Sequence, residues 1–332
     1  MLACGASREE TRVRAFAAVF AVLCFGCQRD AGGAQKWPQK PIRFIVPFAP
    51  GGPADTIGRL IGYRLSSDLG QQVVVENRPG AGGNIGAAAA AKSPPDGYTA
   101  LVTTSAFAVN VTLSPNPGYD AGKDFIPTAL IASQPNAIIV NATLPAKTLA
   151  DLLSWAKTAK PGFATPGSGT TPHLTAEHLF RFFAKLDMTA IHFKGAAPAI
   201  TAVIASQPPV GSAAISTALP HIQSGKLRAL AVSSAKRIAA LPDVPTLAEC
   251  GVADVEDYTW IGIFFPAGTP PMVVDRTNEA VNRALKDPET RSQLDRQAYD
   301  PVGGTPREFA GFVRAEIGKW GKIVREANIQ AE

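Results

Sequence analysis

The stretch Ile42-Arg-Phe-Ile-Val-Pro-Phe-Ala-Pro-Gly-Gly-Pro-Ala-Asp-Thr56 decides the fold. Its first five residues read as a short β-strand bounded by prolines, and Gly-Gly-Pro is typical of a turn that opens a helix. Beyond the turn, apolar residues recur with helical spacing at Ile57, Leu60, Ile61 and Leu65. The segment therefore predicts a strand, a glycine-bearing loop and an amphipathic helix, in that order.

The same order repeats along the chain. Strands are predicted at 72–76, 98–103, 137–140, 162–165, 189–193 and 227–232, and helices at 86–92, from 148 onward, at 172–186 and at 197–206. This alternation predicts an α/β fold with parallel sheets joined by helical crossovers. We expect the strand at 258–265 to be long enough to link two lobes, and the segment after Pro306 to form an amphipathic helix.

Length and composition are those of a folded protein with one or two domains. The chain has 332 residues, of which 46% are hydrophobic and 18% charged, so disorder is excluded. Its net charge is +5, but basic residues are scattered and form no long run, so no nucleic-acid partner is expected. No apolar run of membrane-spanning length follows Gln35, so no membrane span is predicted in that part.

The first 34 residues are predicted to be a secretory signal peptide. Arg12 and Arg14 precede the apolar stretch 15–26, and the small residues at 31–34 suit a cut before Gln35. The protein is therefore expected in the periplasm. Cys27 follows the apolar stretch and leaves a lipid anchor open as an alternative. Cys250 would then be the one cysteine of the exported chain, which predicts that it has no internal disulfide.

Three predicted loops share one chemistry. Segments 48–55, 165–172 and 193–198 place glycines and small or hydroxyl side chains where a strand ends and a helix begins. Glycine allows close approach of the backbone, and a helix N-terminus offers N–H groups with partial positive charge. Ligands of open α/β sheets gather at the C-terminal ends of strands. The loops therefore predict a site for a small anion such as a carboxylate.

Motifs for catalysis or metal binding fit poorly. Ser168 lies between glycines but not in a G-x-S-x-G elbow, so a secreted serine hydrolase using Ser168 and His173 is a remote alternative. His173, Glu177 and His178 resemble a zinc motif with one residue too many. The segment 80–86 is rich in glycine but misses the dinucleotide spacing. We expect no enzyme, no catalytic residues, no metal and no cofactor.

With these loops in view, the chain resembles the substrate-binding proteins of tripartite tricarboxylate transporters, the Bug receptor family. The resemblance is carried above all by Val46-Pro-Phe-Ala-Pro-Gly-Gly-Pro-Ala-Asp55 and Glu76-Asn-Arg-Pro-Gly-Ala-Gly-Gly-Asn-Ile-Gly86. Further matches follow in order at 37–38, 41–43, 95–99, 167–170, 173–174, 194–195, 198–199, 219–232, 241–249, 260, 266–270 and 305–306. They span nearly all of the chain after the predicted signal peptide.

The resemblance implies a two-lobed periplasmic-binding-protein fold of type II, a flytrap with its ligand cleft between the lobes. Lobe 1 would comprise 35–135 plus 258–332, and lobe 2 would comprise 136–257. Carried over by position, the ligand-binding residues would be Pro50, Gly51, Gly52, Asp55, Gly83, Asn84, Ser105, Ser168, Thr170, Thr171, Lys194, Gly195 and Ala196. The expected role is capture of a small carboxylate for the membrane permease subunits of such a transporter, by a monomeric receptor.

The sequence departs from the family pattern beside the third loop. His192-Phe193 stand where the family usually has Pro-Tyr, and Ser212-Ala213 stand in a strand where many members carry a carboxylate. A cleft without an acid lacks a counter-charge for an ammonium group. We therefore expect a mono- or dicarboxylate without an amine. A sensor that presents its ligand to a signalling partner is the alternative to a transport receptor.

Overall fold

A computed structural model describes Met1 and residues 37–252, 255–326 and 329. Residues 38–332 form one compact unit, and of the unit before it only Met1 and Trp37 are described. The predicted signal peptide, its cut before Gln35 and the lipid anchor at Cys27 lie outside the described residues. Within the described part, no helix has the length and apolar character needed to cross a bilayer.

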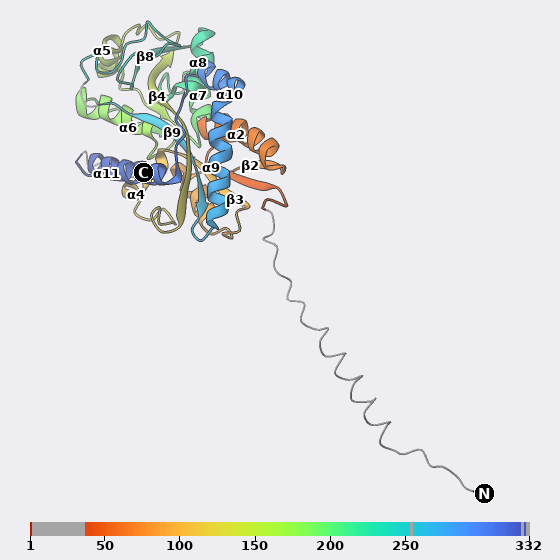
Figure 1. Ribbon diagram of the computed structural model, residues 1–332. Helices are drawn as coiled ribbons and strands as arrows, with labels where there is room; N and C mark the ends of the chain where they lie inside the picture. The colour runs from red at the N-terminus through yellow and green to blue at the C-terminus, as the bar shows by residue number, and fades with distance from the viewer. Residues whose placement is uncertain (2–36, 253–254, 327–328, 330–332) are drawn as a thin grey trace. The chain divides into compact units, whose positions relative to one another are not determined.

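Two sheets share one strand, and we name them sheet A and sheet B. Sheet A contains β2 (Val73–Asn77), β1 (Ile42–Val46) and β3 (Thr99–Thr104) in parallel, followed by antiparallel β9 (Tyr258–Pro266) and the segment Phe125–Pro135 of β4 (Phe125–Asn141). The short β10 (Asp300–Pro301) also pairs with β4. The three parallel strands confirm the predicted α/β pattern (Figure 1).

Sheet B begins where β4 continues past Pro135. Its segment Asn136–Asn141 pairs with β7 (Val210–Ala214) and β8 (Leu227–Val232), and β7 is followed by parallel β5 (Phe163–Thr165) and β6 (Ala190–His192). The C-terminal ends of β5, β6 and β7 therefore meet at one edge, as those of the parallel strands do in sheet A.

The strand that takes part in both sheets is β4. The predicted strand at 258–265 is present as β9 and pairs only within sheet A among the described strands. Sequence periodicity showed only residues 137–140 of β4. The rest of β4 includes Pro127, Pro135 and the polar run Ser133-Gln134, and its register shifts at two places. Such a strand lacks the regular apolar pattern by which strands are found.

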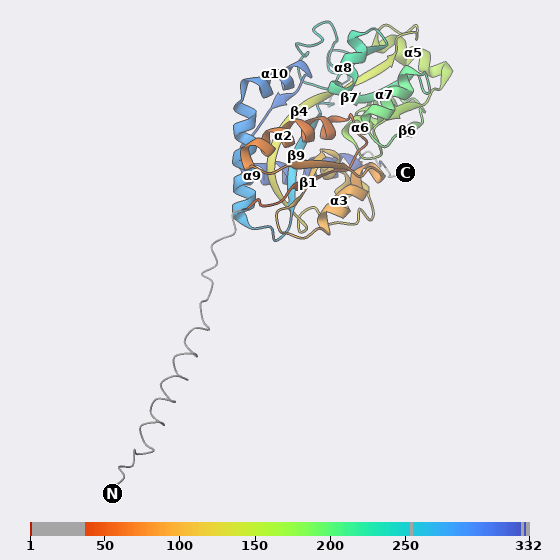
Figure 2. The same cartoon turned by 90° about the vertical axis from the view of Figure 1, so that its right-hand side faces the viewer.

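Helices cover both sheets. With sheet A lie η1 (Ala81–Gly83), α2 (Pro53–Leu69), α3 (Asn84–Ala91), α4 (Ala106–Leu113), α9 (Pro271–Lys286), α10 (Pro288–Arg296) and α11 (Pro306–Glu326). With sheet B lie α5 (Leu149–Ala159), α6 (Thr171–Glu177), its π-helical continuation η2 (His178–Phe183), α7 (Ala196–Ile204) and α8 (Ile215–Gln223). Figure 2 shows α7 and α8 beside β7, in the half of the unit away from α3.

Apolar clusters of described residues hold these layers together. One lies under α11, where Phe309 and Trp320 pack with Trp260 and Phe264 of β9, which confirms the predicted amphipathic helix. Two others lie on the two faces of sheet B. The helix predicted from Thr148 is also confirmed, because its capping hydrogen bonds to and from Asp151 are both present.

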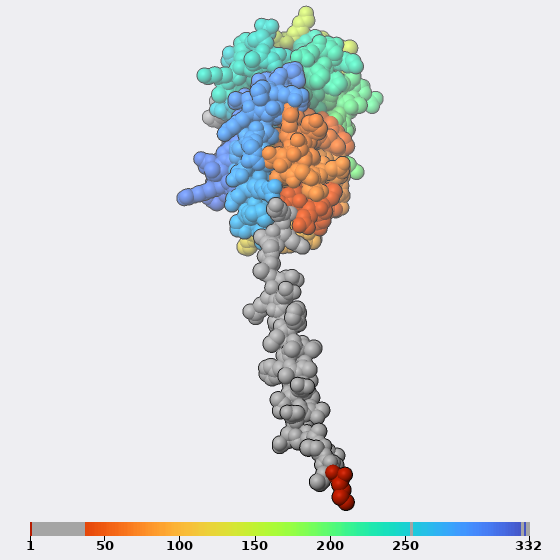
Figure 3. Space-filling model, turned by 45° about the vertical axis from the view of Figure 1, so that its right-hand side comes forward, coloured from red at the N-terminus to blue at the C-terminus, as the bar shows by residue number. Residues whose placement is uncertain are grey.

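The helices α2 and α9 lie side by side, joined by charged side chains. Arg283 of α9 contacts Asp68 at 2.7 Å, and Arg64 of α2 contacts Asp287 at 3.1 Å. Figure 3 shows this face, with α2 in orange against the blue C-terminal helices. These contacts tie the C-terminal segment to the first βα unit of sheet A.

Candidate ligand-binding site

The N-termini of α2, α4, α6, α7 and α8 converge on one small cavity. Its lining consists of residues at or next to these helix starts, together with residues of the preceding loops and of β9: Phe48, Gly52, Pro53, Thr104, Pro166, Thr170, Pro172, Ala196, Ala214 and Thr259. Its volume is about 30 Å³, room for one or two water molecules. We call it the inner cavity. Helix N-termini carry partial positive charge, so their convergence favours an anion.

A second cavity adjoins the inner one, and we call it the outer cavity. Phe48 and Pro166 line both. The remaining lining comes from the turn before α3, the loop before α6 and the loop before α7: Gly80, Ala81, Gly82, Gly83, Gly167, Ser168, His192, Phe193 and Lys194. Its volume is about 170 Å³. Both volumes lie well below the roughly 300–1,000 Å³ of pockets for drug-sized ligands, so the site suits a small molecule.

Loops of sheet A and sheet B touch each other around these cavities. The backbone N–H of Ala49, after β1, donates to the carbonyl of Lys194, after β6, at 2.8 Å. An alanine methyl carbon at position 82 would lie 2.1 Å from the carbonyl oxygen of Ser168. The glycine-bearing loops of the two sheets thus face one another, and their backbones are in contact.

Asn110 of α4 strengthens this contact. Its side-chain amide donates to the carbonyl of Gly82 at 3.0 Å, and its carbonyl oxygen lies so close to Gly169 that a Cβ there would be 2.0 Å away. Asn110 is buried. One side chain therefore contacts a loop from each sheet.

A chain of buried hydroxyl groups continues below the cavities. The Ser105 and Thr171 hydroxyls lie 3.0 Å apart, and the Thr171 and Thr259 hydroxyls 2.8 Å apart. Thr259 then donates to the side-chain Oδ1 of Asn136, at the start of the sheet B segment of β4, at 2.7 Å. These hydroxyl contacts connect the start of α4 to the start of α6. They also reach Asn136 and Thr259, where the polypeptide passes between the two sheets.

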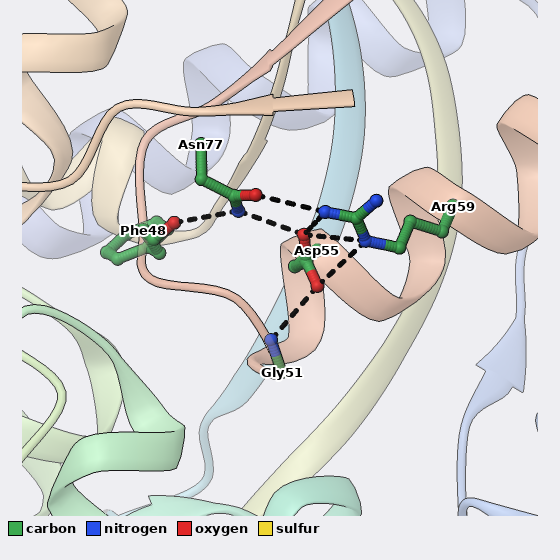
Figure 4. A network of polar contacts seen from close by, with 5 residues as sticks. All are labelled: Phe48, Gly51, Asp55, Arg59 and Asn77. Atoms are coloured by element: carbon green, nitrogen blue, oxygen red, sulfur yellow. Dashed lines mark hydrogen bonds and ion pairs between the residues drawn. The ribbon is translucent and has the colours of Figure 1, made fainter. Parts of the chain in front are cut away.

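Asp55 holds the first loop in shape (Figure 4). Its carboxylate accepts hydrogen bonds from the Gly51 N–H at 2.9 Å, from Arg59 and from Asn77, and Asn77 also donates to the Phe48 carbonyl. Burial raises the pKa of Asp55, but the hydrogen bonds from Arg59, Gly51 and Asn77 outweigh it and leave the pKa below its usual value. Because these groups occupy the carboxylate, it fixes the loop that presents Gly52.

The residues predicted to bind ligand fall into three groups. Gly52, Thr170 and Ala196 line the inner cavity, and Gly83, Ser168 and Lys194 line the outer one. The others support these loops or lie within them: Pro50, Gly51, Asp55, Asn84, Ser105, Thr171 and Gly195. Contact of each with a ligand stays a prediction.

Sequence reasoning did not single out Thr104, Asn110, Ala214 or Thr259. Thr104 follows a predicted strand directly, so its position was a usable signal. Asn110 and Thr259 reach the site only through the folding of distant segments, and the strand that ends at Ala214 was indicated by the family resemblance alone. No local pattern marks such positions.

His173, in the first turn of α6, is a structural residue that holds the loop before this helix. Its Nδ1 accepts the Gly169 N–H at 3.3 Å, and its Nε2 lies 3.8 Å from Glu177, too far for a hydrogen bond. Burial lowers the pKa of His173 to about 3, with a further contribution from His192, so the ring is neutral. The Ser168 hydroxyl has no hydrogen-bond partner among the described residues. These observations give the remote hydrolase alternative no support.

Two sheets sharing a strand, with helix N-termini from both converging on a small cavity, define a solute-binding protein of the two-lobed periplasmic-binding-protein fold. The profile described as tripartite tricarboxylate transporter family receptor matches residues 57–329. The chain therefore belongs to the family of tripartite tricarboxylate transporter receptors.

Solved structures agree with this assignment. The periplasmic binding protein BugD is 31% identical, with a TM-score of 0.86 over 89% of this chain and 100% of its own. Rpa4515 of R. palustris with adipate is 34% identical, with a TM-score of 0.85 over 89% and 100%. MatC of Rhodopseudomonas palustris with bound malate is 32% identical, with a TM-score of 0.83 over 87% and 100%.

Proposed function

We propose that this protein captures a small carboxylate between the loops of sheet A and sheet B and releases it unchanged. The observation that carries this proposal is the convergence of helix N-termini from both sheets on the inner cavity. Thr104, Thr170 and Thr259 line this cavity, and in this proposal their hydroxyls and the backbone N–H groups at the helix starts turn to the anion when the loops close on it. The adipate and malate bound to two similar proteins are both carboxylates.

Closure of the loops supplies the affinity in this proposal. Lobe 1 would be 35–135 plus 258–332 and lobe 2 would be 136–257, which agrees with the change from sheet A to sheet B between Pro135 and Asn136. Ligand entry requires the loops to separate, since the inner cavity holds no more than a water or two. Closing over the ligand excludes water and strengthens its charged hydrogen bonds.

The partners and location follow the family. We propose that the exported protein works as a monomer in the periplasm, free or anchored at Cys27, and delivers its ligand to the membrane permease subunits of a tripartite transporter. The similarity to BugD, a periplasmic binding protein, supports this location.

A thermal-shift screen tests the function. We expect the melting temperature to rise with amine-free mono- or dicarboxylates, because a ligand that binds only the folded protein adds about 2.7 kcal/mol at a hundred times its Kd. Aspartate and glutamate serve as matched compounds with an ammonium group. Stabilisation by the amino acids above that by amine-free acids, confirmed by calorimetric titration, would overturn the proposed ligand class. No shift with any carboxylate would overturn the function itself.

A further inference from the structure

We infer that this protein binds its carboxylate together with a proton, which comes from the solvent and is taken up by Asp257. The inference rests on the proposed function, but Asp257 itself lines neither cavity. Its carboxylate is connected to the inner cavity through two contacts. Asn136 donates to it at 2.5 Å and accepts from Thr259 at 2.7 Å, and Thr259 lines the inner cavity.

The surroundings of Asp257 favour its neutral form. The residue is 4% exposed, so water does not solvate a negative charge on it. Its carboxylate accepts hydrogen bonds from Asn136 and Thr175, which are both neutral, and among the described residues no cation lies within ion-pair distance of it. Burial raises its pKa to about 6 against these hydrogen bonds, so a nearby charge can move its titration through neutral pH.

Other titratable groups near Asp257 do not compensate its charge. They come from α6, α11 and its own chain segment: His173, Glu177, Lys319, Glu256 and Tyr258. Lys319 is exposed and donates to the backbone carbonyl of Glu256 at 3.3 Å, so water and salt screen its charge. His173 is neutral, because burial lowers its pKa to about 3. Glu177 lies 3.6 Å from Arg181, and a negative charge on it would favour a neutral Asp257 further.

The contacts around Asp257 accommodate a proton without rearrangement of the backbone. With the proton on Oδ2, the carboxyl group donates to the Thr175 hydroxyl, which it contacts in the structure. The hydrogen of that hydroxyl then bonds the Thr171 carbonyl, 2.9 Å away. Asn136 keeps its hydrogen bond to Oδ1. Both charge states of Asp257 therefore fit the same network.

A ligand carboxylate in the inner cavity raises the proton affinity of Asp257, because two like charges in a buried site repel each other. Two hydrogen bonds and one side chain separate them, a distance on the order of 10 Å, at which unit charges change each other's binding about ten-fold at a dielectric constant near 20. By linkage, the proton tightens ligand binding by the same factor. Affinity is therefore highest below the free-state pKa of about 6 and falls about ten-fold as the pH rises to about 8.

Calorimetric titration at pH 6.5 counts the protons taken up. The probes are malate, succinate, adipate, hexanoate and benzoate, each titrated in PIPES and in imidazole, two buffers with different ionisation enthalpies. The difference between the two measured heats gives the number of protons that accompany the ligand. For the wild-type protein we expect about half a proton per bound ligand at pH 6.5, and about ten-fold weaker binding at pH 8 than at pH 5.5.

Two variants assign the proton to its site. Asp257→Asn keeps a neutral side chain that donates to Thr175, and it is expected to take up no proton and to bind equally well at both pH values. Asp243→Asn makes the same change at an exposed carboxylate that lines neither cavity, and it is expected to keep the wild-type uptake. Infrared difference spectra supply a second measurement, since ligand binding at pH 6.5 should add the C=O band of a protonated carboxylic acid in the wild-type protein but not in Asp257→Asn.

Two results would overturn the inference but leave a carboxylate receptor. One is the absence of proton uptake by the wild-type protein, which requires no variant to fold. The other is uptake that persists in Asp257→Asn, which would place the proton on another group, such as His192 of the outer cavity. Failure of every acid to bind would instead overturn the proposed function.

Discussion

Replacing Gly82 with alanine is expected to reduce carboxylate affinity about a hundred-fold while the protein stays folded. The added methyl carbon would lie 2.1 Å from the backbone carbonyl oxygen of Ser168, on the opposite loop. No side-chain rotation can relieve a clash with backbone, so the two loops must separate. A cost of about 3 kcal/mol, the upper end for overpacked sites, corresponds to roughly a hundred-fold in Kd.

Gly70→Ala is the matched control for this variant. Both glycines have a left-handed backbone, with φ of +60° at Gly82 and +73° at Gly70, so alanine adds similar strain of about 1–2 kcal/mol at either position. At Gly70, however, no atom lies within 4 Å of the added carbon. Titration should therefore show a large loss of affinity only for Gly82→Ala. Unchanged affinity in that variant would mean that ligand binding does not require these loops to meet.

Replacing Asp257 with asparagine is expected to stabilise the protein at pH 8. Asp257 is buried at the start of β9, where Asn136 donates to its carboxylate at 2.5 Å and Thr175 also donates to it. The Thr175 hydroxyl has one proton, yet the Thr171 carbonyl lies 2.9 Å away as a second acceptor. A neutral group at position 257 that donates to Thr175 frees that proton for Thr171, and asparagine is such a group.

The effect should depend on pH. Burial raises the pKa of Asp257 to about 6, although hydrogen bonds from Thr175 and Asn136 oppose it. A carboxyl whose pKa is higher in the folded state contributes stability that is present below about pH 4 and is lost as the pH rises through about 6. The side chain of the Asp257→Asn variant never ionises, so we expect a gain of about 2–3 kcal/mol at pH 8 and almost none at pH 4.

Denaturant unfolding at both pH values measures this gain, with Asp243→Asn, an exposed carboxylate, as the control expected to change stability by under about 0.5 kcal/mol. His173 has the opposite dependence, because its lowered pKa makes the folded protein lose stability as the pH falls below about 6.5. The two groups partly cancel in the wild-type protein, so comparison of variants is needed. Destabilisation of Asp257→Asn at pH 8 would show that the ionised carboxylate holds the network.

The sequence predicted the repeated βα units because their signals are local. The strand at Ile42–Val46, the turn at Gly51-Gly52 and the stripe of α2 each depend on neighbouring residues, and the structure has all three. Of the shared strand β4 only residues 137–140 were predicted, because Pro127 and Pro135 interrupt the pattern of the rest, while its long-range pairing to β9 and β7 holds it in place. Pairing between distant segments produces no periodic pattern of apolar residues in the sequence.

For the candidate site, too, the features with a local sequence signal were predicted and those that depend on long-range contacts were not. Glycines at strand ends identified the loops, since close backbone approach needs a residue without a side chain. The contacts between loops, such as Asn110 with Gly82, depend on how the two sheets are joined and could not be read from spacing. The buried Asp257 was missed for the same reason, because only the fold brings it to Asn136 and Thr175.

A crystal structure of the protein with its tightest-binding carboxylate tests the central claim most directly. We predict density for a carboxylate in the inner cavity, bounded by Gly52, Thr170 and Ala196, with its oxygens within hydrogen-bond distance of backbone N–H groups from both sheets. Density at another place on the surface, or contacts to the loops of one sheet alone, would contradict the account.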